Sequence, residues 1–199
     1  MSRIVLRGGV EVGNPLELTL EFLAAYADYA VPGSSGPLAE ADLRTANRGG
    51  ARISAVEIAA ILERRDEIDR SLRELQPDAS LGDATGSIPW ATLTRLFDAF
   101  SDIRGVGFSK MTKTLHPKRP ALIPMLDSVV QEYLATDEAG PPSGAFGERA
   151  IDLVRRYKRD LDRNGPVLRE LRRELARREH RLTEVRILDI LIWSVSASR

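Results

Sequence analysis

The residues best suited to chemistry lie within positions 103–128, IRGVGFSKMTKTLHPKRPALIPMLDS. The stretch opens with a Gly-Val-Gly turn, Gly105 to Gly107, placed between two segments whose apolar residues recur at helical spacing. Glycines permit a tight turn, and they let an anion approach the backbone N–H groups at the start of the next helix. Residues 102–119 hold five cations and one acid. A helix, a tight glycine turn and a second helix are therefore predicted, with anion binding as the chemistry that the turn allows.

Asp127 is the second feature of interest, because it follows the apolar run Leu122 to Leu126 directly. A helix is expected to begin at this point, and aspartate is a preferred N-cap because its carboxylate accepts a backbone N–H bond. A carboxylate in this place could equally serve a site. The sequence leaves both roles open.

The segment Ile103-Arg104-Gly105-Val106-Gly107, followed by Asp127, resembles the signature of the helix-hairpin-helix DNA glycosylase superfamily. In that superfamily a hairpin of this kind is followed, at a similar interval, by a short apolar segment and an aspartate. The resemblance covers Trp90 to Val130. The block GVGFSKMTKTLHPKRPALIPMLDS is more closely similar to an uncharacterised bacterial family.

The resemblance implies a role for each part of this stretch. The hairpin is expected to bind a DNA phosphate, and Asp127 is expected to stabilise the sugar cation that forms as a base departs. Members that also cut the strand carry a lysine where this chain has Ser109, and Lys110 is turned away by about 100° on a helix. A monofunctional N-glycosylase without Schiff-base chemistry is therefore the enzyme that the resemblance implies. The expected nucleic-acid-binding residues are Gly105, Val106, Gly107, Ser109, Lys110, Lys113, His116, Lys118 and Arg119, and the expected partner is double-stranded DNA.

Composition limits the other possibilities. The chain of 199 residues has no cysteine, which excludes disulfides and an iron–sulfur loop. Its net charge is zero, but residues 1–102 hold 10 Lys/Arg and 16 Asp/Glu, whereas residues 103–199 hold 19 and 13. The two parts therefore carry −6 and +6, so the molecule can present a basic face, although solvated helix surfaces are the commoner use of such charge.

Motifs for metals and nucleotides are missing from the sequence. The two histidines, His116 and His180, lie far apart, and neither belongs to a zinc-binding spacing. The chain has no Walker-type loop and no GxGxxG fingerprint. We therefore expect no metal and no cofactor. No signal peptide or membrane span is recognisable, so no membrane association and a cytoplasmic location are expected.

Helix starts and stops are marked along most of the chain. Asn14-Pro15 and the box from Ser54 to Glu57 are strong helix starts, and Gly165-Pro166 predicts a helix end. Alternating residues 3–7 predict a short strand or extended arm. Trp90 is expected in the core, with a stacking platform for a base as the alternative. Helices are expected at residues 14–29, 37–46, 54–75, 90–100, 108–116, directly after Asp127, and at 146–161, 167–178 and 185–195.

These elements predict an all-α protein, a helical bundle like that of the helix-hairpin-helix DNA glycosylases, with a short N-terminal β element. Residues 1–199 are expected to form a single compact unit. Its central segment is 88–135, and residues 1–87 and 136–199 are expected to pack together as the other half, with a cleft between. Two functions remain open: a DNA base-excision glycosylase with Asp127 as catalytic carboxylate, or a noncatalytic binding module of the same fold for a protein, nucleic acid or small molecule.

Overall fold

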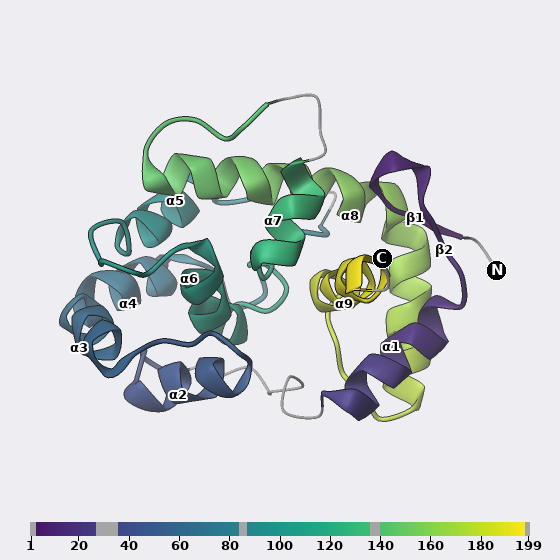
Figure 1. The fold of residues 1–199 in the computed structure, drawn as a ribbon, viewed down its shortest axis with the longest axis horizontal. Coiled ribbons are helices and arrows are strands. Elements are labelled where there is room, and N and C mark those ends of the chain that lie inside the picture. Colours follow the sequence, from purple (N-terminus) through teal and green to yellow (C-terminus); the bar gives the residue numbers. More distant parts are fainter. Residues whose placement is uncertain (1–2, 27–35, 84–86, 136–139, 198–199) are drawn as a thin grey trace.

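The computed structural model describes residues 3–26, 36–83, 87–135 and 140–197, which fold into helices and one small sheet (Figure 1). The strands are β1 (Ile4–Val5) and β2 (Glu11–Val12). The helices are α1 (Pro15–Ala25), α2 (Glu40–Arg48), α3 (Ala55–Glu63), α4 (Arg65–Glu74), α5 (Trp90–Asp98), α6 (Phe108–Leu115), α7 (Ser128–Ala135), α8 (Phe146–Arg177) and α9 (Glu184–Ala197), with 3-10 turns at Arg7–Gly9 and His116–Lys118.

The small sheet confirms the N-terminal β element. β1 and β2 pair antiparallel, with Ile4 opposite Val12, and the connection between them uses Gly8 and Gly9 at φ 69° and 74°. The hairpin is tied to α8 by Asn164, whose amide accepts from the Val5 N–H at 2.9 Å and donates to the Val5 carbonyl at 3.0 Å. A side chain thus replaces the neighbouring strand that β1 lacks on this side.

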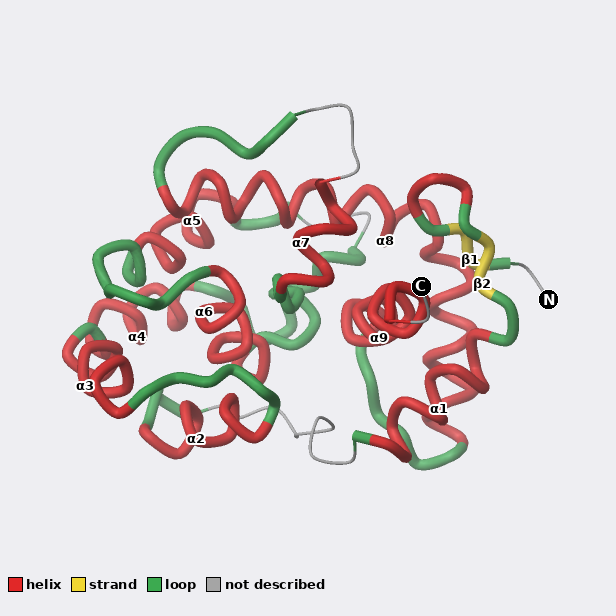
Figure 2. The backbone as a smooth tube through the Cα atoms, viewed as in Figure 1, coloured by secondary structure: helices red, strands yellow, loops and turns green. Residues whose placement is uncertain are grey.

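The helices form two groups joined by α8. In Figures 1 and 2, helices α2 to α6 lie on one side of the molecule, while α1, α9 and the two strands lie on the other. α8 runs along both groups, packing on α5 at one end and on α9 and β1 elsewhere. α7 stands between the groups and contacts both α8 and α9. Among the helices that the structure describes, none has the length and apolar character needed to cross a membrane.

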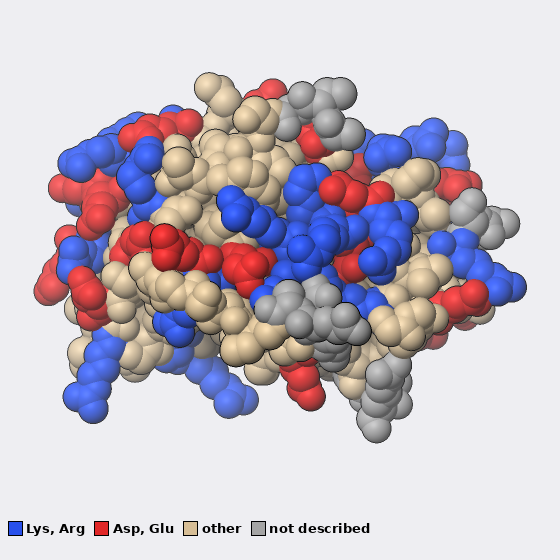
Figure 3. All heavy atoms as spheres, turned by 90° about the horizontal axis from the view of Figure 1, so that it is seen from above, with Lys and Arg blue, Asp and Glu red and all other residues tan. Residues whose placement is uncertain are grey.

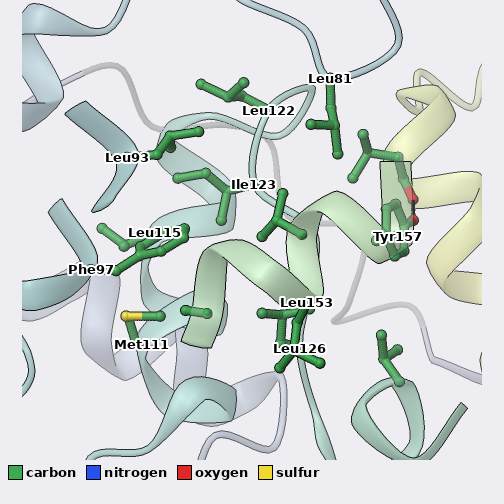
Figure 4. Close-up of a cluster of buried hydrophobic side chains, with 14 of the residues drawn as sticks. Leu81, Leu93, Phe97, Met111, Leu115, Leu122, Ile123, Leu126, Leu153 and Tyr157 are labelled. Atoms are coloured by element: carbon green, nitrogen blue, oxygen red, sulfur yellow. Dashed lines mark hydrogen bonds between the residues drawn. The ribbon is translucent and has the colours of Figure 1, made fainter. Parts of the chain in front are cut away.

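The core around the hairpin unit is built from several elements at once. Figure 4 shows Leu93 and Phe97 of α5 and Met111 and Leu115 of α6 turned toward Leu122, Ile123 and Leu126 of the segment that follows, with Leu153 and Tyr157 of α8 alongside. All of these side chains are almost completely buried. The apolar run before Asp127 is therefore an extended core segment that holds the start of α7 in place.

Two predictions about the elements need correction. α8 does not end at Gly165-Pro166: it continues through Pro166, although Figure 1 shows it changing direction along its length. Buried leucines on both sides of the proline, Leu161 and Leu168, anchor the two parts in one core, which outweighs one lost backbone bond. The expected helix 54–75 is instead two helices, α3 and α4, separated at Arg64 (φ −91°, ψ 4°).

The first 87 residues are divided between the two groups of helices. α1 packs on α8 and α9, and β1 packs on α8, whereas α2 packs on α6, α4 packs on α5, and α3 packs on α2 and α4. The division of the molecule therefore falls within the N-terminal region, between α1 and α2. The predicted extension of the first helix to residue 29 lies outside the described residues from position 27 on.

Candidate functional site

A cleft of about 670 Å³ opens where the two groups of helices meet. α1 and α9 form one wall, and the other wall is made by the segment after α2, the glycine hairpin and α6. Asp127 and the first residues of α7, a helix that stands between the two groups in Figure 1, also line the cleft. Six of the residues singled out by the sequence line this one cleft: Gly105, Gly107, Ser109, Lys110, Lys113 and Asp127.

Asp127 caps α7 and lines the cleft at the same time. One carboxylate oxygen, Oδ1, accepts from the Val130 N–H at 3.0 Å, which is an N-cap bond three residues into the helix. The side chain is only partly buried. Both roles that the sequence left open are therefore compatible with its position.

The glycine hairpin is shaped in part by a carboxylate from α3. Gly105 has φ +84°, and a Cβ added there would lie 2.3 Å from Glu57 Oε1. The same oxygen accepts from Lys110 Nζ at 2.6 Å, so Lys110 bridges α6 to α3. Glu57 also closes the capping box with Ser54, as predicted for the start of this helix. The Val106 N–H is used inside the turn, where it donates to the Ile103 carbonyl at 3.0 Å.

Three of the predicted nucleic-acid contacts bond to other parts of the protein and lie outside the cleft. Lys118 is 4% exposed and pairs with Asp42 at 2.7 Å while donating to two backbone carbonyls before α2. Arg119 donates to the carbonyls of Leu72 and Leu75 at the end of α4. His116 Nδ1 lies 2.7 Å from the Ile123 carbonyl oxygen. These three side chains connect loops to the core, and none of them lines the cleft.

Burial fixes the protonation state of His116. Desolvation, with a smaller contribution from the Arg186 charge, lowers the pKa of His116 to about 4, against the favourable bond to the Ile123 carbonyl. The imidazole is therefore neutral near pH 7, with Nδ1 protonated as the donor in that bond.

Two charged groups that the sequence did not assign complete the cleft. Asp189 and Arg186, both on α9, are 3% and 6% exposed and line it opposite the hairpin. Burial raises the pKa of Asp189 to about 7, and the nearby Asp127 charge adds to this rise, whereas Arg186 opposes it. The signal for Asp189 was present in the sequence, since it interrupts the most apolar run of the chain.

Several cationic side chains lie close together around Asp127 and Asp189. Lys113 is buried, and desolvation lowers its pKa; Asp127 opposes the shift, while Arg186 and Arg52 add to it. Arg52 lies in the cleft wall after α2 with φ +56°, a left-handed conformation that is uncommon for a residue with a side chain. Three cations from three elements therefore surround Asp127 and Asp189.

An aromatic cluster forms the wall of the cleft that belongs to α1 and α9. Phe22, Tyr26 and Trp193 lie with ring centroids 4.9 to 5.5 Å apart, and Tyr26 is 39% exposed. The Arg186 guanidinium lies 5.5 Å from the Phe22 ring centroid. Trp90, by contrast, lies outside the cleft, and the Arg155 guanidinium covers its ring. The available stacking platform is thus contributed by α1 and α9 and not by the hairpin unit.

A larger groove of about 1360 Å³ lies between α1 and the C-terminal half of α8, but its lining is chemically simpler. Leu16, Leu20, Val167 and Leu171 form its floor, and exposed charged side chains form its rim. It contains no member of the hairpin unit and neither Asp127 nor Asp189. The central cleft is therefore the better candidate for a site.

Positive charge in the second part of the chain is spread over the solvent side of α8. Figure 3 shows Lys and Arg gathered in the middle of the face that is seen from above, with acidic side chains among them. α8 runs along this face and has exposed arginines at positions 155, 159 and 163. Ion pairs such as Lys158–Asp162 and Arg177–Glu174 neutralise part of this charge, as the helical spacing predicted.

Comparisons with known proteins give a family but no activity. No curated protein and no solved structure matches the chain. A family model matches residues 24–196, a span that includes α2 to α8, the hairpin and every residue of the cleft described above except Phe22. The chain belongs to this family, DUF6308, a family of unknown function.

Proposed function

We propose that this protein binds DNA and hydrolyses the N-glycosidic bond of a nucleotide held in the central cleft. The observation that carries the proposal is the convergence of four kinds of group on one cleft: the hairpin glycines, Asp127, a cluster of cations and an aromatic wall. A nucleotide has matching parts, because its phosphate is anionic and its base presents an apolar face. The cleft volume, about 670 Å³, lies in the range of small-molecule sites.

Each group has a defined task in this proposal. Arg52 and Lys113 attract the phosphate of the bound nucleotide, and the exposed ring of Tyr26 stacks on its base. Asp127 stabilises the positive charge that develops on the sugar as the base leaves, and it orients the attacking water. The base takes up the electron pair of the broken bond together with a proton, and the water supplies the hydroxyl group at the sugar.

The phosphate contacts differ from those expected from the sequence. Lys118 and Arg119 bond to other parts of the protein, and the Glu57 carboxylate lies against Gly105. The contacts with the DNA phosphate are therefore assigned to Arg52, Lys113 and the N-terminus of α6. A substrate that enters the cleft as a single turned-out nucleotide requires few backbone contacts, which agrees with a net charge of zero.

Binding is tested first. Fluorescent duplex DNA, intact or with an abasic-site analogue, is titrated at two salt concentrations. We expect the lesion to be preferred, the affinity to fall with salt, and Arg52→Gln to bind several-fold more weakly. Arg173→Gln is the matched control, because it removes an exposed arginine of α8 outside the cleft.

Catalysis is tested with duplexes that each carry one modified base, with alkali used to reveal abasic sites. Asp127→Asn keeps an oxygen for the α7 cap but removes the charge, so product formation is expected to fall at least about 100-fold with binding retained. If the wild-type protein binds these duplexes but forms no product from any of them, the proposed hydrolysis is wrong.

A second function is favoured by one specific observation, the bond from the Val130 N–H to Asp127. This cap is a sufficient reason for an aspartate at the start of α7 without any catalysis. The protein would then be a noncatalytic binding module of the same fold. DNA binding without activity, or no DNA binding at low salt, would select this alternative, with a protein or small-molecule partner in the second case.

A further inference from the structure

Asp189 is an unusual residue for the helix in which it lies. The residues around it in α9, from Ile187 to Ile192, are otherwise apolar and have no exposed surface. A carboxylate in such surroundings is costly unless it is fully paired, and it is more stable when it carries a proton. The position of Asp189 therefore calls for an explanation beyond packing.

The bonds of Asp189 reach the segment that carries Asp127. Asp189 Oδ2 accepts from the Met125 N–H at 3.3 Å, and Met125 is two residues before Asp127. Asp127 in turn accepts from the Val130 N–H. Two bonds from backbone N–H groups to carboxylates therefore connect α9, through the segment that carries Asp127, to the first turn of α7.

The other oxygen of Asp189 has no donor to accept from in the described part of the protein. Oδ1 is buried and makes no hydrogen bond within the described part of the protein. The Tyr157 hydroxyl lies next to the carboxyl group, but it donates to the Val185 carbonyl at 2.6 Å. The hydroxyl proton of Tyr157 is thus used, and its oxygen can only accept. A proton on Asp189 would supply the missing donor and complete the chain from Asp189 through Tyr157 to Val185.

We propose that Asp189 is the positioning residue of this cleft: it fixes the segment that presents Asp127, and it does so as a neutral, proton-carrying carboxyl group. Loss of the proton places a second negative charge beside Asp127, and it leaves the Asp189 carboxylate and the Tyr157 oxygen side by side with no proton between them. The segment from Met125 to Asp127 then shifts. The titratable and charged groups around it come from five elements: Arg52 after α2, Lys113 of α6, Asp127 at the start of α7, Tyr157 of α8 and Arg186 of α9.

The proposal deepens the function proposed above and rests on it for the catalytic role of Asp127, whereas the protonation and positioning are measurable without any substrate. The full chain is labelled with 15N and with 13C at the aspartate carboxyl carbons, and its NMR spectra are followed from pH 5 to 9. The Val130 amide reports the position of Asp127, because it donates to that carboxylate.

We expect the Asp189 carboxyl resonance to titrate near neutrality, with the Met125 and Val130 amides moving at the same midpoint. In Asp189→Asn, which supplies a permanent donor, the Val130 shift should stay near its low-pH value throughout. Asp152→Asn is the control, because Asp152 lies on α8 with its side chain 40% exposed and should leave the titration unchanged.

Two results would overturn the proposal: an Asp189 carboxyl that is already ionised at pH 5, or a Val130 amide that does not follow it. The wild-type titration decides both points even if the Asn variant fails to fold. If the glycosylase assay gives no product but the titration is as expected, the proposed enzymatic function is wrong and the positioning of Asp127 by Asp189 is supported.

Discussion

The Asp127 carboxylate has a structural role and a proposed catalytic role, and substitution separates the two. Its Oδ1 caps α7, which any side chain with a suitably placed oxygen can do, while its negative charge is needed only for the proposed chemistry. The structural role therefore depends on shape, and the proposed catalytic role on charge. Asparagine retains the first property and alanine retains neither.

We expect Asp127→Ala to lower the free energy of unfolding by about 1 kcal/mol, the usual value of an N-cap, and Asp127→Asn to lower it by less than half of that. Urea denaturation at pH 7 measures both. Ser128→Ala, on an exposed neighbour, is the control. Equal losses for Ala and Asn would mean that the charge of Asp127, and not its cap bond, stabilises the fold.

Gly105 and Gly107 are alike in the sequence but not in the structure. Gly105 has φ +84° and is in close contact with Glu57, whereas Gly107 has φ −93° and open space where a Cβ would be. Glycine is therefore required at position 105, because of the positive φ and the close contact with Glu57, and it is not required at position 107.

Gly105→Ala is accordingly expected to destabilise the protein by roughly 1–2 kcal/mol for the left-handed conformation alone, with an added loss as Glu57 is displaced from Lys110. Gly107→Ala should cost less than half as much. The two variants are compared by urea denaturation. A larger effect at Gly107 would contradict this account of the turn.

Among the elements, the β-hairpin depends on one side chain of α8. Asn164 is 3% exposed, and it makes two bonds to Val5 in the pattern of a neighbouring strand, besides the bond to the Asp160 carbonyl within α8. A two-stranded sheet is marginal by itself, so this contact, together with the ion pair from Arg7 to Asp160, holds it on the molecule.

Asn164→Ala is expected to cost about 1–3 kcal/mol, because it leaves a partly buried donor and a partly buried acceptor of Val5 without the side chain that they bond. Hydrogen exchange at the Val5 amide should accelerate far more than exchange in α5. Asp162→Ala, at an exposed position of the same helix, is the control. Unchanged protection at Val5 would show that the sheet is held by packing alone.

The elements also show which features local sequence could predict. The box Ser54 to Glu57 marked the start of α3, because capping is decided within four residues. The continuation of α8 through Pro166 was not predictable in this way, since it depends on leucines that pack on distant helices. The same holds for α2 to α4, whose place beside the hairpin unit is decided by tertiary contacts.

The cleft shows the same limit at the level of the whole molecule. Six lining residues came from one continuous stretch whose pattern could be read directly. Asp189, Arg186 and the aromatic wall come from α1 and α9, which are more than 50 residues away and have no motif of their own. Lys118 and Arg119 looked like surface cations, and the structure uses them to connect loops through backbone carbonyls.

The whole-molecule response to pH depends on two buried groups that titrate in the same range with opposite effects. The pKa of His116 is lowered to about 4, so the unfolded chain binds more protons than the folded one below about pH 6.5, and stability falls as pH drops. The pKa of Asp189 is raised to about 7, so the folded chain binds more protons between about pH 4 and 7, and stability falls as pH rises. Each slope approaches about 1.4 kcal/mol per pH unit, so the two nearly cancel.

The combined contribution of His116 and Asp189 to the free energy of unfolding of the wild type should therefore vary little between pH 5 and about 6.3. In Asp189→Asn the contribution of His116 remains alone, so the free energy of unfolding should rise with pH by up to about 1.4 kcal/mol per unit. In His116→Asn, which can keep a donor to the Ile123 carbonyl, it should fall with pH by a similar amount. The double variant should be flat again. Urea denaturation at intervals of half a pH unit measures all four proteins. A flat profile for Asp189→Asn would mean that the pKa of His116 is not lowered in the folded protein. A wild-type profile that rises with pH as steeply as that of Asp189→Asn would mean that Asp189 is ionised in the folded protein.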